Sequence, residues 1–156
     1  MRIKDSKLSI LIILVIIVKL ITFCTPESCL EETTSFVNAT FYKSSTDKLT
    51  APDSITVFGI GKETNRLYSK SLNLTAIKLP LDASSEICGF VMKINNITDT
   101  IKFIYLGYPH LISKECGITF FYSLDTALVS GNAINTIKIL NKNITTFNAE
   151  NIRIYY

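Results

Sequence analysis

Short runs in which apolar residues alternate with polar ones are the feature of this sequence that most constrains its fold. Beyond residue 34 these runs are rich in Ile, Val, Thr, Phe and Tyr, and clusters of Asn, Gly, Asp, Ser and Pro separate them. In SFVNATFY (35–42), for example, Val37, Ala39 and Phe41 fall on one face of an extended strand. Alternation of this kind indicates β-strands that bury one side.

The alternating runs predict an all-β domain of seven to eight strands. Residues 87–94 and 100–106 flank the turn NNITD and are expected to form a hairpin. We therefore predict a two-sheet antiparallel sandwich, immunoglobulin-like or a related Greek key, without the Trp that marks antibody domains. The strands are expected within residues 35–42, 54–60, 66–82, 87–94, 100–106, 113–124, 134–140 and 151–156.

Residues 1–24 have the layout of an export signal, with a charged start and an apolar run, LSILIILVIIV, at residues 8–18. Its 11 residues suit a signal peptide and fall short of the roughly 20 that a membrane-spanning helix prefers. Tolerating Lys19 would lengthen the run, so an N-terminal anchor helix that is not cleaved remains open. We divide the chain into a signal peptide or lipoprotein leader (1–24), a tether (25–34) and a β-sandwich domain (35–156).

The formal net charge of +3 comes entirely from the leader. From Thr25 onward, 12 Lys and Arg residues balance 12 Asp and Glu residues. Nucleic-acid binding needs a clustered positive surface that displaces the counterions of phosphates. We therefore expect no nucleic-acid partner.

No motif in the sequence supports catalysis or a cofactor. His110 is the one histidine and lies in GYPHL (107–111), which we read as a solvated turn. FGIGK (58–62) lacks the spacing of a phosphate-binding loop and reads as a strand-ending turn, and no second Cys pair follows Cys24 and Cys29 to complete a metal site. We expect a protein that is not an enzyme, with an envelope hydrolase that uses scattered carboxylates as the alternative.

Several motifs, in order along the chain, resemble an uncharacterised family of small Bacteroidota lipoproteins. They are the leader, CLEETT (29–34), VFGIGK (57–62), IKLPLD (77–82), TDTIKFIY (98–105), ISKECG (112–117), INTIKIL (134–140) and NIRIYY (151–156). The resemblance implies that Cys24 is the lipidated cysteine, although Phe23 stands where such leaders carry a small residue. It also implies that Cys29 and Cys116, the second and third cysteines of the pattern, form a disulfide.

Cys88 has no counterpart in that family pattern. It lies on a strand with Phe90, Met92 and Ile94, so we expect a buried free thiol.

Two kinds of glycosylation motif remain open. Ser54, Thr100 and Thr126 each follow an Asp and precede an aliphatic or Ala residue, which resembles the acceptor pattern of periplasmic O-glycosylation in Bacteroidota, although Asp-Ser and Asp-Thr are also ordinary turn residues. N-x-S/T motifs raise a second alternative, a secreted N-glycosylated protein with an uncleaved anchor. They occur at Asn38, Asn73, Asn96 and Asn143.

Together these features predict a non-enzymatic envelope lipoprotein that acts as a binding or structural module. The resemblance places it in the outer membrane through its N-terminal lipid or anchor, facing the periplasm or the cell surface. Its expected partners are the membrane and an envelope protein or glycan.

Overall fold

The computed structural model describes residues 28–156, which form strands and loops and contain no helix. The prediction of an all-β domain is therefore confirmed for these residues. The predicted leader or anchor helix, with Cys24, lies outside them. Across the described part of the chain, no helix has the length and apolar character needed to cross a membrane.

Residues 31–156 form one unit, which holds all the described strands. Predicted strand 66–82 is two strands, and two short strands were not predicted. The strands are β1 (Phe36–Lys43), β2 (Lys48–Leu49), β3 (Ile55–Gly59), β4 (Arg66–Ser71), β5 (Ala76–Pro80), β6 (Ile87–Ile94), β7 (Ile97–Ser113), β8 (Gly117–Val129), β9 (Thr136–Ile139), β10 (Asn143–Ile144) and β11 (Ile152–Tyr155).

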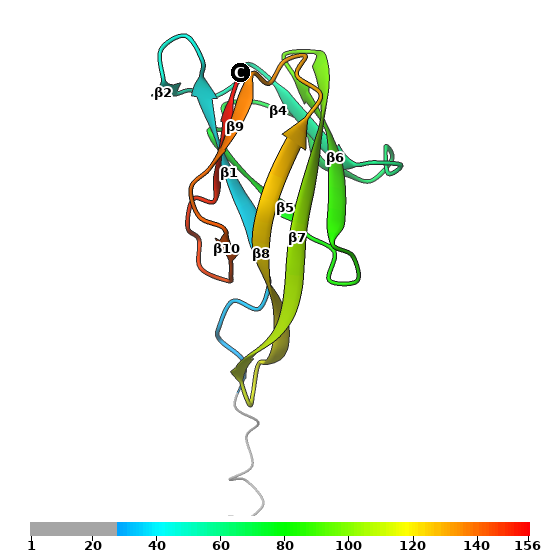
Figure 1. Ribbon diagram of the computed structural model, residues 1–156, viewed down its shortest axis with the longest axis vertical. Helices are drawn as coiled ribbons and strands as arrows, with labels where there is room; N and C mark the ends of the chain where they lie inside the picture. The colour runs from blue at the N-terminus through cyan, green and yellow to red at the C-terminus, as the bar shows by residue number, and fades with distance from the viewer. Residues whose placement is uncertain (1–27) are drawn as a thin grey trace, which may run out of the picture. The chain divides into compact units, whose positions relative to one another are not determined.

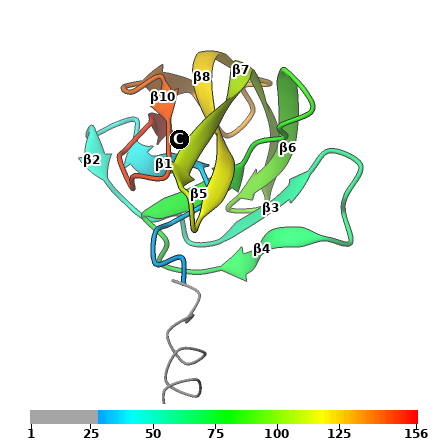
Figure 2. The ribbon, with the colours of Figure 1, turned by 90° about the horizontal axis from the view of Figure 1, so that it is seen from below.

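The strands make two curled sheets, consistent with a sandwich. A five-stranded sheet has the order β2-β1-β11-β9, with β5 also paired to β1, and a six-stranded sheet has the order β10-β8-β7-β6-β3-β4. Viewed from below, the strands curl around a shared interior, with β3 and β4 to one side (Figure 2).

One strand pair corrects the prediction of a purely antiparallel sandwich. β1 and β11 run parallel, with Ala39 opposite Ile152 and Phe41 opposite Ile154. The other pairs in residues 28–156 are antiparallel. The buried side chain of Asn151 secures the start of this pair, because its Oδ1 accepts a hydrogen bond from the backbone N–H of Asn38 at 2.9 Å.

The core lies between the inward faces of the two sheets, as the alternation predicts. Val37, Ala39 and Phe41 of β1 are fully buried and belong to one apolar cluster with Met92 of β6 and Phe103 of β7. Burying a large apolar side chain contributes roughly 1.5–3 kcal/mol relative to leaving it in water. The period-two pattern of the sequence thus directs the large apolar side chains into the interior, where the two sheets pack against each other.

The predicted hairpin is present, with a tighter turn than expected. β6 ends at Ile94 and β7 begins at Ile97, so Asn95 and Asn96 alone form the turn, with φ angles of 48° and 70°. Asn tolerates positive φ better than most residues, and two-residue turns of this type match the twist of paired strands.

β7 is much longer than predicted and includes GYPHL, so the prediction of a turn at His110 was wrong. Proline is tolerated here because β6 pairs with β7 only as far as Ile104. Tyr105 donates its backbone N–H to Glu86 O on the β6 side at 2.9 Å. Pro109, four residues later, has the same backbone orientation as Tyr105. The position where its N–H would be therefore faces the edge of β7 that β6 no longer pairs with.

A buried carboxylate organises the loop after β8. Asp99 on β7 is 1% exposed, and its Oδ2 accepts hydrogen bonds from the backbone amides of Asn132, Ala133 and Ile134 at 2.9, 2.6 and 2.8 Å. Its Oδ1 accepts one from Ser130 Oγ. Burial by itself would raise the pKa of Asp99, but these hydrogen bonds outweigh it and lower the pKa below its usual value.

Candidate binding cleft

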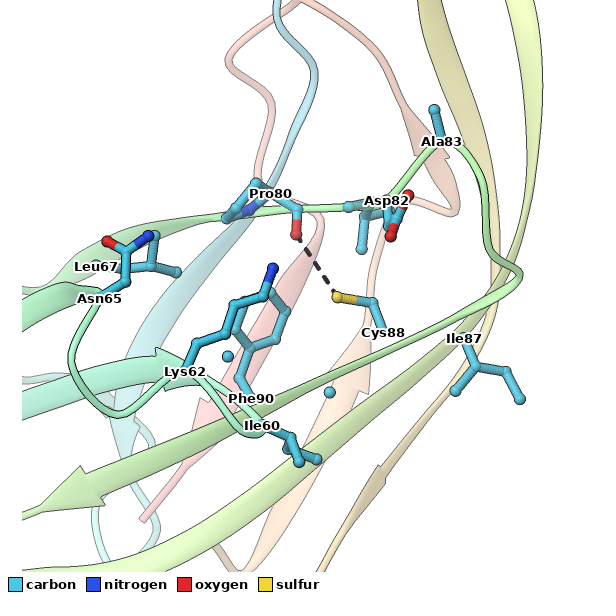
Figure 3. Close-up of a pocket in the computed structure, with 13 residues that line it drawn as sticks. Ile60, Lys62, Asn65, Leu67, Pro80, Asp82, Ala83, Ile87, Cys88 and Phe90 are labelled. Carbon is cyan, nitrogen blue, oxygen red and sulfur yellow. Dashed lines mark hydrogen bonds between the residues drawn. The ribbon is translucent and has the colours of Figure 1, made fainter.

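An open cleft of about 560 Å³ lies between the turn that follows β3 and the segment that joins β5 to β6 (Figure 3). Its size falls in the range of small-ligand sites, roughly 300–1,000 Å³. The side chains that line it are partly apolar and partly polar. The apolar ones include Ile60, Leu67, Leu81, Ile87 and Phe90, and the polar ones are Lys62, Asn65, Asp82 and Cys88.

Close packing of two strands shapes the floor of the cleft. Ile60 donates its backbone N–H to Gly89 O at 3.0 Å. A Cβ at Gly89 would lie 2.4 Å from Ile60 Cδ1, closer than carbon atoms approach. The Ile60 side chain therefore lies over Gly89, and a larger residue at position 89 would displace it.

Lys62 and Asp82 bring opposite charges to the cleft from different segments. Lys62 reaches toward the Pro80–Asp82 segment (Figure 3). Asp82 Oδ1 accepts hydrogen bonds from the Ser84 hydroxyl at 2.6 Å and the Ser84 backbone N–H at 2.9 Å. These two bonds, with a smaller contribution from the charge of Lys62, lower the pKa of Asp82, so the carboxylate is ionised at neutral pH.

Cys88 contributes a protonated thiol to the wall of the cleft. Its Sγ lies 3.9 Å from Pro80 O, to which the thiol donates a weak hydrogen bond (Figure 3). Burial, and then the charge of Asp82, raise the pKa of Cys88, while Lys62 partly offsets them. A protonated thiol is a weak nucleophile. The predicted free thiol is confirmed among the described cysteines, although it is half-buried.

Two tyrosines from the core hold the rim of the cleft. The Tyr105 hydroxyl accepts a hydrogen bond from Asp82 N at 3.0 Å and donates one to Asp82 O at 2.9 Å. Tyr122 donates to Leu81 O at 3.4 Å, and the two rings pack edge to face with centroids 5.4 Å apart. Burial raises the pKa of Tyr105 to about 12, so its hydroxyl stays protonated. The rim is therefore fixed before any ligand arrives.

The predicted disulfide between Cys29 and Cys116 is confirmed. Cys116 lies in the turn between β7 and β8, where its backbone N–H donates to Ser113 Oγ at 3.0 Å. Neither cysteine lines the cleft.

The three candidate O-glycosylation residues lie apart from the cleft, and each is half-buried. Ser54 precedes β3, and its backbone N–H donates to Asn95 Oδ1 at 3.2 Å. Thr100 and Thr126 lie within β7 and β8, so the reading of their Asp-Thr pairs as turns was wrong. Their modification stays a prediction.

The four N-x-S/T motifs are scattered over the domain. Asn73 and Asn96 occupy exposed turns at positive φ, and Asn143 is exposed on β10. Asn38 is half-buried on β1.

His110 does not line the cleft with Asp82. Its ring stacks on Phe121 of β8, with centroids 4.0 Å apart and an interplanar angle of 16°. Within residues 28–156, no group of three or more His, Cys, Asp or Glu side chains is placed to hold a metal ion.

A model of a protein family described as a family of unknown function, DUF6452, matches residues 54–156. This range runs from just before β3 to the end of β11 and contains the whole cleft and the β7–β8 hairpin. No curated protein and no solved structure matches the chain.

Proposed function

The chain belongs to the DUF6452 family of unknown function, and from that premise we propose that it is an exported, non-enzymatic binding module held at the membrane by its N-terminus. The membrane is the outer membrane of a Bacteroidota envelope, and the attachment is a lipid on Cys24. The domain faces the periplasm or the cell surface. In this proposal the two sheets form an immunoglobulin-like or related Greek-key sandwich.

The disulfide between Cys29 and Cys116 is the observation that carries the proposal. Stable disulfides are typical of exported proteins, because the cytosol keeps thiols reduced. The bond begins five residues after Cys24, the cysteine that ends the signal-like leader. In a cytosolic protein, Cys29 and Cys116 would be expected to remain reduced thiols.

The chemistry of the cleft supports binding rather than catalysis. Cys88 carries a raised pKa and so remains protonated, and His110 stacks on Phe121 away from the cleft. What the cleft offers is an apolar wall beside one positive and one negative side chain. This combination suits a peptide segment of an envelope protein, with an apolar side chain next to a polar group, better than it suits a glycan.

Intact mass of the mature protein from its native cell tests the attachment. We expect processing at Cys24 and the added mass of acyl chains on that residue. A mature chain that begins after Cys24 without lipid would refute the lipid anchor. Retention of the leader together with sugars on Asn38, Asn73, Asn96 or Asn143 would instead support the secreted glycoprotein.

Photo-crosslinking in the native envelope tests the cleft. A photoreactive amino acid in place of Leu67, a cleft residue that is 41% exposed, should give a discrete adduct whose mass identifies a peptide or a glycan. The matched control is the same change at Leu128, which is 52% exposed and outside the cleft. Adding Lys62→Glu should abolish the adduct at position 67. Equal adducts at both positions would contradict a binding role for the cleft.

A further inference from the structure

The β7–β8 hairpin continues past its neighbouring strands as a two-stranded arm (Figure 1). β6 pairs with β7 only up to Ile104, and β10 pairs with β8 only at Tyr122 and Ser123. Residues 108–121, which we call the arm, are therefore paired only with each other. An isolated two-stranded ribbon is marginally stable in water, so the arm needs further support.

One face of the arm extends the core-facing side of the sheet without being covered. Tyr105 and Tyr122 on this face are buried. Farther along the same face the pairs are Pro109 with Phe120 and Leu111 with Ile118. Phe120, Leu111 and Ile118 are 38%, 60% and 69% exposed, respectively.

The arm carries little charge to compensate for this exposure. Lys114 and Glu115, in the turn at its tip, are its only Lys, Arg, Asp or Glu residues. Tyr108, on the opposite face, is 40% exposed and packs edge to face against Phe121. The exposed apolar surface formed by Leu111, Ile118 and Phe120 is of the kind that marks an interaction site. Tyrosines such as Tyr108 favour the boundary between water and lipid.

The disulfide at the tip of the arm indicates which surface the arm contacts. Cys116 in the tip is bonded to Cys29, and a disulfide holds the two Cα atoms within about 7 Å. Cys29 lies five residues after Cys24, a distance of at most about 18 Å even for an extended chain. Thr119 Oγ1 also donates to Thr33 O at 2.5 Å, so the chain that leads to β1 contacts the arm.

We propose that the apolar face formed by Leu111, Ile118 and Phe120 lies in the interfacial layer of the membrane that holds the N-terminus. The inference rests on the proposed membrane attachment, and it holds for a lipid on Cys24 or for an uncleaved anchor, because both end within a few residues of Cys29. The tip is then a second contact with the bilayer. Two contacts restrict the rotation of the domain, whereas a single flexible tether would not.

Tryptophan quenching in vesicles tests this placement, because the natural chain contains no Trp. The full membrane-attached protein, carrying Ile118→Trp, is reconstituted in phosphatidylethanolamine and phosphatidylglycerol vesicles with brominated acyl chains. We expect loss of emission relative to the same vesicles without bromine. Leu111→Trp provides a second reporter on the same face.

Leu128→Trp is the matched control. Leu128 is 52% exposed and lies on the same strand as Ile118, ten residues away, about 33 Å along the strand. We expect its emission to be the same in both kinds of vesicle. Bromine quenching at positions 118 and 111 but not at 128 supports the proposal.

Flotation of the vesicles separates the two hypotheses. Protein that floats with the vesicles while Ile118→Trp and Leu111→Trp stay unquenched would overturn the placement of the arm and leave the attachment standing. Protein that does not float would overturn the attachment, and the placement of the arm with it. Blue-shifted emission without bromine quenching would show that protein, such as a second copy of the chain, covers the arm, and would also overturn the proposal.

Discussion

Tyr105 holds the backbone of Asp82 at both of its polar groups, because its hydroxyl accepts from Asp82 N at 3.0 Å and donates to Asp82 O at 2.9 Å. The tyrosine lies on the strand that forms the long hairpin, and the aspartate lies in the segment between β5 and β6. The Tyr105 side chain thus links β7 of the six-stranded sheet to the segment that follows β5 of the five-stranded sheet. This hydroxyl makes two of the hydrogen bonds that hold the rim of the cleft, and the Tyr122 hydroxyl makes a third.

We predict that Tyr105→Phe lowers the free energy of unfolding by about 1–3 kcal/mol, because the backbone N–H and C=O of Asp82 both lose the hydroxyl of a buried tyrosine as their partner. Urea denaturation measures the change. Tyr122→Phe is the matched control, since its hydroxyl makes one longer bond, at 3.4 Å to Leu81 O, and should cost less. Equal losses in the two variants would contradict the role assigned to Tyr105.

Asp99 should make stability fall in acid. Its pKa is lowered in the folded state, so the stability it contributes is complete above its usual pKa of 3.8 and is lost as the pH falls through the lower folded value. Asp99→Asn should lower the free energy of unfolding at neutral pH by roughly 1–3 kcal/mol, because a neutral amide with one oxygen replaces the charged acceptor of these hydrogen bonds.

Urea midpoints between pH 7 and pH 2 measure the effect of Asp99. The difference between the natural protein and Asp99→Asn should shrink below pH 3.8. Asp125→Asn, at an exposed position on β8, serves as the control and should change little. A difference between Asp99→Asn and the natural protein that stays constant down to pH 2 would argue against an ionised Asp99 in the fold.

Alkylation should report the environment of Cys88. Because burial and the charge of Asp82 raise its pKa, iodoacetamide at pH 7.5 should modify it more slowly than in the urea-unfolded chain. Asp82→Asn should speed the reaction, and Lys62→Met should slow it, since the two charges act on the thiol in opposite directions. Mass spectrometry at timed intervals gives the rates. Faster modification in the folded protein would refute this account.

The disulfide should be a major contributor to stability. Its loop spans the 86 residues between Cys29 and Cys116, so the double variant Cys29→Ser with Cys116→Ser should lose roughly 4–5 kcal/mol in the chain-entropy model. Urea unfolding provides the measurement, with Cys88→Ser as a thiol control that leaves the bond intact. If reductant lowers the urea midpoint of the double variant as much as that of the natural protein, the loss of stability does not come from this disulfide.

The sequence predicted those parts of the fold that depend on burial of one side of a strand. Alternation placed Val37, Ala39 and Phe41 on the face that the structure buries, and it gave the hairpin of β6 and β7. The extension of β7 was missed because Gly107 and Pro109 favour turns locally. The open edge beyond Ile104 removes the reason that proline is normally excluded from a strand.

The cleft could not be read from the sequence. Lys62 and Asp82 are twenty residues apart in separate loops, and both line the cleft because β3 pairs with β6 and Tyr105 holds the segment at Asp82. Neither of these long-range contacts leaves a periodic pattern in the sequence. Asp99 was likewise taken for a turn residue, since its partners lie more than thirty positions away at Asn132, Ala133 and Ile134.

The parallel pairing of β1 with β11 has a consequence for the order of events during biosynthesis. Asn38 and Asn151, which secure this pair, are 113 residues apart in the chain. A ribosome-bound chain that has emerged only as far as β8 therefore lacks the central partner of its first strand. Contacts of such long range form slowly. The five-stranded sheet thus cannot close until the last strand of the domain has been synthesised.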